Sequence, residues 1–424
     1  MNIREYSSLN ERVYETKLSN GLTVFVVPKP GFHKKFAIFA TKYGNSDRRF
    51  KIGGRWTETP TGVAHFLEHK MFDTEYGNAL EKLSENGASP NAYTENDMTV
   101  YYFECIDKFS DNLEILLSFV SKPYFTKESV EKEQGIISQE IRMYEDDAGY
   151  NLYYGLLRSL FKHSPVREPI VGSVEGIASI DRDMLYDCHK VFYSPSNMVL
   201  CVVGDVDVDE VSDIAAKILP ETSCECPERD YGLPESVVPE IFEGGKAMDI
   251  SLPIFLAGSK TKPPPHGVMM LKNDIISALS LDLLAGHSSP LYQRLYADGL
   301  VSTDFSASYD AVSGVAYTLF GSETREPQRV FNEVMAEIQR LLADGSDAAL
   351  FERIKKATTG SFIRSLNSFG AIATGLAEGY FYDFDTFEIP EILSKITVED
   401  INKYFEENLV PENFAMYTIY PNNN

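Results

Sequence analysis

The stretch Ile180-Asp-Arg-Asp-Met-Leu-Tyr, followed by Ser194-Pro-Ser-Asn-Met-Val-Leu, recurs later as Ile396-Thr-Val-Glu-Asp-Ile-Asn, followed by Val410-Pro-Glu-Asn-Phe-Ala-Met. In both copies a Pro-x-Asn turn begins fifteen residues after the isoleucine. Each copy predicts a capped helix, a turn and a β-rich strand, at 199–203 and 414–419. We interpret the chain as two diverged copies of one α+β unit, although two unrelated helix-turn-strand segments would also give this pattern.

A segment near the middle of the chain separates the two copies. It gathers prolines and glycines among charged residues, a composition that disfavours a helix or a central strand. The 424 residues are enough for two domains of about 200 residues each. We therefore expect one domain at 1–220, a linker at 221–245 and a homologous domain at 246–424.

The first half contains several segments with strand character. Leu22-Thr-Val-Phe-Val-Val and Lys35-Phe-Ala-Ile-Phe-Ala-Thr predict a hairpin, and Thr99-Val-Tyr-Tyr-Phe-Glu predicts another strand. Helical spacing of apolar residues begins near Thr61, Leu80, Asp111 and Glu128. Because strands and helices are grouped and do not alternate, we expect an α+β fold in which each half is a sandwich of an antiparallel sheet and helices.

The composition of the chain argues against several classes of protein. The formal charge of −24 argues against a nucleic-acid partner, since binding phosphates requires clustered Lys and Arg. The polar N-terminus does not resemble a secretory signal, and no apolar run is long enough to span a membrane. Five cysteines without a framework spacing suit a reducing compartment. We expect a cytoplasmic protein without a membrane partner.

Residues 65 to 69 read His-Phe-Leu-Glu-His within a predicted helix. The spacing places His65 and His69 one turn apart on one face, with Glu68 on the same side. Two imidazoles and one carboxylate can hold Zn²⁺ and leave a fourth position for water, whose pKa the ion lowers towards about 7. The H-x-x-E-H pattern is the inverted form of a zinc-peptidase motif, although two surface histidines beside a solvated Glu would also match it.

A second predicted helix, from Glu128 to Met143, offers the carboxylate. Glu133 and Glu140 are seven residues apart on it, so that two helical turns separate them on nearly the same face. From the spacing alone either could reach a metal ion. The neighbouring acidic residues are expected to be solvated charges.

Three segments together resemble a known family. They are Thr61-Gly-Val-Ala-His-Phe-Leu-Glu-His-Lys-Met-Phe, Asn86-Gly-Ala-Ser-Pro-Asn-Ala-Tyr-Thr, and the helix with Glu133 and Glu140 that runs into Glu145-Asp-Asp. The chain resembles the metallopeptidases that include pitrilysin, insulin-degrading enzyme and mitochondrial processing peptidase. The resemblance implies that His65, His69 and Glu140 are the zinc ligands of the first domain.

The resemblance also implies further roles. Glu68 matches the general base and Glu133 an acidic residue that supports the ligands, while the second domain matches a non-catalytic copy. Asn91, Ala92 and Tyr93 match the edge strand on which the family lays an extended peptide, although a turn leading into an ordinary strand would read the same way. The family forms clamshells whose two bowls enclose a peptide chamber, and subunits of this length assemble as dimers.

One segment departs from the family pattern. Many relatives carry an Arg and then a Tyr after a segment much like Ser289-Pro-Leu-Tyr-Gln-Arg-Leu, and these residues steady the substrate and its oxyanion. Here the segment continues as Tyr296-Ala-Asp-Gly-Leu-Val-Ser-Thr-Asp, and Arg294 comes too early. Either a sister subunit supplies the pair in a heterodimer, or a homodimer uses another donor such as Tyr93.

The sequence thus predicts a zinc-dependent endopeptidase or oligopeptidase that hydrolyses extended peptides in a chamber, with Glu68 passing a proton from water to the leaving amine. The alternative is a non-catalytic scaffold or peptide-binding subunit of a processing complex. Loss of a zinc ligand would favour that alternative, and His65, His69 and Glu140 are all present.

Overall fold

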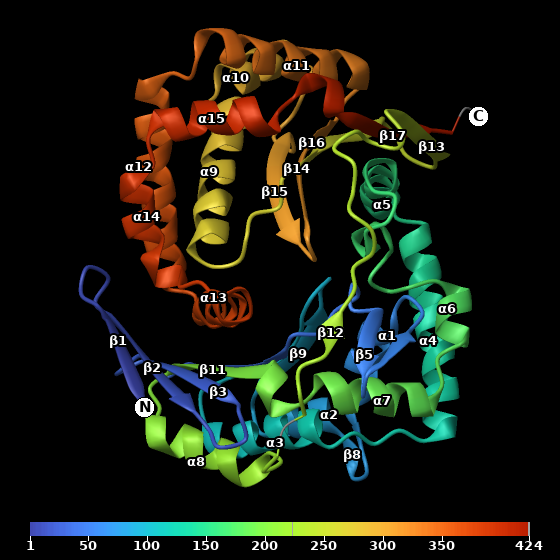
Figure 1. Cartoon of the computed structure of the whole chain (residues 1–424), viewed down its shortest axis with the longest axis vertical. Coiled ribbons are helices and arrows are strands. Elements are labelled where there is room, and N and C mark those ends of the chain that lie inside the picture. Colours follow the sequence, from blue (N-terminus) through green and yellow to red (C-terminus); the bar gives the residue numbers. More distant parts are fainter. Residues whose placement is uncertain (223, 423–424) are drawn as a thin grey trace. The chain divides into compact units, whose positions relative to one another are not determined.

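The computed structural model describes residues 1–222 and 224–422 (Figure 1). Ser223 of the predicted linker, and Asn423 and Asn424 at the end of the predicted second domain, lie outside this range. The chain divides into two compact units, each built from segments that are not continuous in sequence. The first unit comprises Met1–Ile141, Pro169–Tyr231 and Ile363–Phe387, and the second comprises Arg142–Glu168, Gly232–Phe362 and Glu388–Asn424.

The first unit contains a seven-stranded sheet in the order β1-β2-β3-β11-β4-β10-β9. Its strands are β1 (Asn2–Tyr6), β2 (Glu11–Lys17), β3 (Thr23–Pro28), β11 (Met198–Gly204), β4 (Lys35–Thr41), β10 (Thr99–Cys105) and β9 (Ser89–Thr94). The predicted hairpin of β3 and β4 is wrong, because β11 lies between them, parallel to β3 and antiparallel to β4. The sheet is therefore mixed and not antiparallel throughout. Every residue of β11 is buried, so its backbone needs partners on both edges.

The second unit repeats this topology. Its sheet runs β13-β17-β14-β16-β15, with β17 parallel to β13 and antiparallel to β14. The strands are β13 (Glu243–Met248), β17 (Ala415–Pro421), β14 (Ile254–Thr261), β16 (Val315–Glu323) and β15 (Ser306–Val312). In each unit the last strand of the sheet in sequence order follows a capped helix and a short 3₁₀ turn, and it enters between two earlier strands, β3 and β4 in the first unit and β13 and β14 in the second. The internal repeat and the α+β fold are confirmed.

Helices cover these sheets. The helices of the first half are α1 (Val63–Met71), α2 (Ala79–Glu85), α3 (Phe109–Ser121), α4 (Lys127–Glu145), α5 (Ala148–Leu160), α6 (Val174–Ala178), α7 (Arg182–Phe192) and α8 (Val208–Ile218). Those of the second half are α9 (Val268–Ala285), α10 (Pro290–Ala297), α11 (Pro327–Asp344), α12 (Ala348–Ser365), α13 (Phe369–Tyr382), α14 (Ile389–Lys395) and α15 (Val398–Asn408).

Shorter elements complete the description. They are β5 (Arg49–Ile52), β6 (Arg55–Glu58), β7 (Asp73–Thr74), β8 (Gly77–Asn78), β12 (Glu228–Arg229), and the 3₁₀ turns Pro165–Arg167, Pro195–Asn197, Thr386–Glu388 and Pro411–Asn413. Among the described residues, no helix is both long and apolar enough to cross a bilayer.

Each unit takes one helix from the other half of the sequence. In Figure 1 the late helix α13 lies beside the earlier strand β11, and its apolar side joins the core of the first unit. In the same way α5 packs on β17 and β14 in the second unit. Burying one large apolar side chain of such a helix contributes about 1.5–3 kcal/mol relative to leaving it in water. The continuous domains 1–220 and 246–424 stay a prediction, since these compact units are interleaved.

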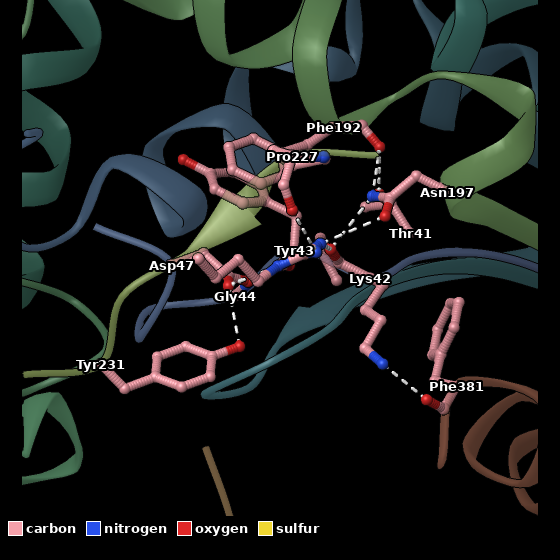
Figure 2. Close-up of polar contacts among 12 residues, drawn as sticks. Thr41, Lys42, Tyr43, Gly44, Asp47, Phe192, Asn197, Pro227, Tyr231 and Phe381 are labelled. Carbon is pink, nitrogen blue, oxygen red and sulfur yellow. Dashed lines mark hydrogen bonds and ion pairs between the residues drawn. The ribbon is translucent and has the colours of Figure 1, made fainter. Parts of the chain in front are cut away.

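Part of the predicted linker is fixed to the first unit by a buried ion pair. Arg229 Nε donates to Asp47 Oδ1 at 2.8 Å, and the Asp47 side chain is fully buried. Figure 2 shows that Asp47 also accepts from the hydroxyl of Tyr231 and the N–H of Gly44, at 3.1 and 2.9 Å. The Arg229 guanidinium lies 5.5 Å from the centre of the Phe192 ring, within cation–π range. Residues 228–231 are therefore anchored to the unit that carries β5.

The same polar cluster also contacts helix α13 through a lysine side chain. Lys42, next to β4, donates through Nζ to the carbonyl oxygen of Phe381 at 2.6 Å, near the C-terminus of the helix (Figure 2). A cation there satisfies an open carbonyl and complements the helix dipole. Burial lowers the pKa of Lys42 below its ordinary value. The contact ties the exchanged helix to the sheet.

Replacing Asp47 tests the anchor. The Asp47→Ala substitution leaves the Arg229 charge without its buried partner, and we expect the free energy of unfolding of the first unit to fall by about 3–5 kcal/mol in urea titrations. Glu228→Gln is the matched control, because it breaks the exposed Lys51–Glu228 pair on the same short strand and should change that free energy by less than about 1 kcal/mol. If both variants had the same midpoint urea concentration of unfolding, the anchoring role of Asp47 would be contradicted.

Candidate metal centre and active site

Helix α1 presents the H-x-x-E-H residues from a buried position. It begins after Gly62, whose φ of 88° is left-handed and whose Cα faces the Val171 carbonyl oxygen so closely that a Cβ would lie 2.9 Å from it. Only glycine fits this start without strain. His65 and Glu68 are buried on the helix, and the His65 and His69 rings lie 4.6 Å apart. The packing of α1 therefore holds His65 and Glu68 in place, whereas His69 is only partly buried.

Helix α4 brings Glu140 to the two histidines. Its carboxylate oxygens lie 3.8 Å from His65 Nε2 and 3.7 Å from His69 Nε2. One ligand atom from each residue lies within 4.8 Å of the other two. A tetrahedral zinc ion with bonds of about 2.0–2.1 Å separates its ligands by about 3.4 Å. The three side chains thus form a candidate group for a zinc ion with one coordination position left open, and their role as its ligands stays a prediction.

The second acidic residue of α4 contacts the ring of His69. Glu133 Oε1 lies 3.0 Å from His69 Nδ1, which directs Nε2 of the same ring towards Glu140. Such a carboxylate fixes the tautomer and orientation of a metal-binding imidazole. The structure thus separates the two glutamates that helical spacing left equivalent: Glu140 lies in the candidate metal group, whereas Glu133 contacts the ring of His69.

The two imidazoles have opposite electrostatic surroundings. Burial lowers the pKa of His65 to about 3, and the nearby His69 adds to this effect. Burial also acts to lower the pKa of His69, but the hydrogen bond with Glu133 and the charges of Glu140 and Glu68 outweigh it and raise that pKa. A metal ion requires neutral imidazoles, and the burial of His65 favours that form.

Glu68 lies beside the ligands and contacts Thr94. The Thr94 hydroxyl donates to Glu68 Oε2 at 2.7 Å. Burial raises the pKa of Glu68, while this hydrogen bond opposes the rise. The sequence prediction placed Thr94 on the edge strand but gave it no contact with Glu68. The period of two in a strand indicates only that the side chains of Thr94 and Tyr93 lie on opposite faces of the sheet.

The predicted peptide-binding residues lie on β9, the last strand of the sheet. Among the described residues β9 pairs only with β10, so its other edge is open. Asn91 is exposed, whereas Ala92 and Tyr93 are partly buried. Tyr93 packs against the core cluster that includes α13, and burial raises its pKa to about 12. This placement on the face away from Glu68 argues against Tyr93 as an oxyanion donor, and peptide binding by the three residues stays a prediction.

Arg294, the residue that seemed too early for the family pair, lies on α10 of the second unit. Its guanidinium pairs with Glu333 and Glu337 at 3.3 and 3.7 Å. Two carboxylates therefore already engage it. Tyr296 on the same helix is half exposed.

Two sequence models of one peptidase family match the chain. The model described as insulinase, peptidase family M16, matches residues 51–173, and the model described as the peptidase M16 inactive domain matches residues 179–358. The chain belongs to peptidase family M16. The first match contains His65, Glu68, His69, Glu133 and Glu140, so that the zinc motif falls in the half that does not bear the inactive-domain description.

Individual M16 relatives agree with this assignment. The chain is 36% identical over 424 residues to YmfH of Bacillus subtilis (strain 168), named an uncharacterized zinc protease, and the match covers 98% of each chain. It is 25% identical over 414 residues to the beta subunit of the mitochondrial-processing peptidase of Saccharomyces cerevisiae, covering 91% of this chain and 86% of the other. A solved M16-like protein of Alicyclobacillus acidocaldarius superposes with a TM-score of 0.94 at 32% identity, over 99% of this chain and 100% of the other.

Metal binding by variants tests the ligand set. We expect Glu140→Gln to abolish stoichiometric zinc binding, because it removes a charged ligand, and Glu133→Gln to weaken zinc affinity by about 10–100-fold. Glu131→Gln is the control, since this residue is exposed on the same helix and pairs only with Lys127 at 3.7 Å among the described residues. Competition with a chelator measures all three affinities. A Glu140→Gln protein with wild-type affinity would contradict the assignment.

Proposed function

We propose that the chain is a zinc-dependent endopeptidase or oligopeptidase that hydrolyses peptide bonds in extended peptides. The observation that carries the proposal is the convergence of His65, His69 and Glu140 beside a buried Glu68. The M16 zinc-protease names of the relatives support it.

The residues of the site divide the work of hydrolysis. His65, His69 and Glu140 would hold a zinc ion, which would supply Lewis acidity towards the scissile carbonyl and the attacking water. Glu68 accepts the proton from the attacking water and then gives it to the nitrogen of the leaving amine. The raised pKa of Glu68, which burial causes, suits a group that must both take up and release a proton.

The open edge of β9 provides a way to hold the substrate. An extended peptide can pair with an unpaired strand edge through its backbone, which gives affinity without requiring one sequence. Asn91, Ala92 and Tyr93 lie along this edge, and Thr94 at its end contacts Glu68. We propose that the peptide backbone pairs there and that the family chamber restricts access to extended chains.

The source of the oxyanion donors leads to a proposal about assembly. Since Arg294 is engaged by Glu333 and Glu337 and Tyr93 faces away from Glu68, we favour a cytoplasmic heterodimer whose sister subunit supplies an Arg and a Tyr. A homodimer with another donor is the second possibility. A non-catalytic peptide-binding subunit is the rival function, and the complete ligand set counts against it.

Glu68→Gln tests the proposed chemistry. Glutamine keeps the size of the side chain but cannot accept the proton of water, so we expect zinc binding to remain and peptide cleavage to fall by at least about 100-fold. The measurement is hydrolysis of a quenched fluorescent peptide library together with zinc content. Unchanged turnover in this variant would exclude Glu68 as the general base.

Capture from the protein's own cells tests the assembly. The inactive Glu68→Gln form should retain both a stoichiometric partner and trapped peptides, identified by mass spectrometry. We expect a second M16-type subunit that lacks H-x-x-E-H. Robust cleavage by the purified wild-type chain alone would contradict the heterodimer.

A further inference from the structure

A row of three threonines ends at the carboxylate of Glu68. Thr41 on β4 pairs with Thr99 on β10, which pairs in turn with Thr94 on the edge strand β9. Directly opposed residues of neighbouring strands project their side chains to the same face. Thr41 and Thr99 are fully buried, and Thr94 is partly buried. The row therefore runs from the inside of the sheet to the edge beside α1.

The hydrogen bonds of this row have a defined direction. A threonine hydroxyl has one proton to donate. Thr41 donates to the carbonyl oxygen of Phe192 at 2.6 Å, and Thr99 donates to that of Tyr43 at 2.8 Å. The proton of Thr99 is thus committed to a backbone carbonyl. Towards Thr94 its oxygen can only accept, and that contact is long, at 3.4 Å.

The proton of Thr94 is consequently directed to Glu68. The 2.7 Å contact with Glu68 Oε2 is much shorter than the contact with Thr99, and an ionised carboxylate only accepts. Among the residues that the structure describes, Thr94 is the one hydrogen-bond donor to this carboxylate. Oxygen Oε2 is therefore engaged, whereas Oε1 is left for another proton.

We propose that Thr94 is a positioning residue that sets which oxygen of Glu68 handles the proton. This inference rests on the proposed peptidase function. Oε1 accepts the proton from water while the water oxygen bonds to the carbonyl carbon, and Oε1 then gives the proton to the amine nitrogen as the C–N bond breaks. Thr94 keeps its own proton throughout and holds Oε2 in place.

The Glu68 carboxylate needs a hydrogen bond to fix its orientation because the glutamate side chain is flexible. The terminal torsion of Glu is broad, so burial alone does not select one orientation of its carboxylate. Without Thr94, no other hydrogen bond among the described residues would hold the Glu68 carboxylate in one orientation. Thr94 supplies this hydrogen bond from β9, a different element from the helix that carries Glu68.

Two substitutions separate the hydrogen bond from the shape of the side chain. Thr94→Val keeps the branched shape but has no donor, and we expect kcat to fall by roughly 10–100-fold while KM and zinc stoichiometry change little. Thr94→Ser restores the donor and should recover most of the lost kcat. Thr16→Val is the control: Thr16 lies on β2 of the same sheet, and its hydroxyl has no hydrogen-bond partner among the described residues.

A double variant shows whether Thr94 acts through Glu68. In the Glu68→Gln background, Thr94→Val should cause no further loss of the residual activity. Assays use the zinc-loaded protein with any subunit that copurifies from its own cells. If the wild type is active, any one of three results would overturn the positioning role alone. They are a Thr94→Val variant as active as the wild type, a Thr94→Ser variant that does not recover kcat, and a loss of activity from Thr94→Val that is equally large in the Glu68→Gln background. A zinc-loaded wild type that cleaves no peptide would instead overturn the proposed function and this role with it.

Discussion

Strand β11 is buried at every residue, and its backbone N–H and C=O groups find partners only through pairing on both edges. That requirement separates β3 from β4, and beyond β4 the sheet continues with β10 and then β9. Because β9 comes last, its outer edge is open and its final residue, Thr94, reaches the helix that carries Glu68. The candidate active site thus lies where helix α1 meets the end of this edge strand.

The same constraint explains the exchanged helices. Inserting the last strand of each half makes a sheet whose second face must still be covered, and α13 and α5 supply this cover from the opposite half. The contact of Lys42 with Phe381 and the buried pair of Asp47 with Arg229 then fix α13 and the start of the linker to one unit. The zinc residues lie in a framework whose cohesion depends on both halves of the sequence.

Local patterns predicted the parts of this structure that local physics determines. The i, i+4 spacing on one helix was enough to bring His65 and His69 together, and the Pro-x-Asn repeat correctly indicated two similar units. Glu140 required the family resemblance, since helical spacing could not distinguish it from Glu133. The β3–β4 hairpin failed because a strand more than 150 residues later competes for the same edges, which no local pattern reveals. The contact between Thr94 and Glu68 likewise depends on how the edge strand meets α1.

The two imidazoles of the candidate metal centre lie one helical turn apart and have different electrostatic surroundings. Burial lowers the pKa of His65, whereas the hydrogen bond with Glu133 and the nearby carboxylates raise that of His69. Two imidazoles and one carboxylate with an open position suit a catalytic and not a closed structural zinc site, which usually has four protein ligands. Cysteine is absent from the ligand group found among residues 1–222 and 224–422.

X-ray absorption spectroscopy of the zinc-loaded chain tests this centre most directly. The structure predicts two imidazole nitrogens at about 2.0–2.1 Å and oxygen ligands at about 2.0–2.2 Å, with the imidazole scattering reduced by half in His69→Ala. A sulfur shell at about 2.3 Å, or an imidazole contribution that His69→Ala leaves unchanged, would contradict the account.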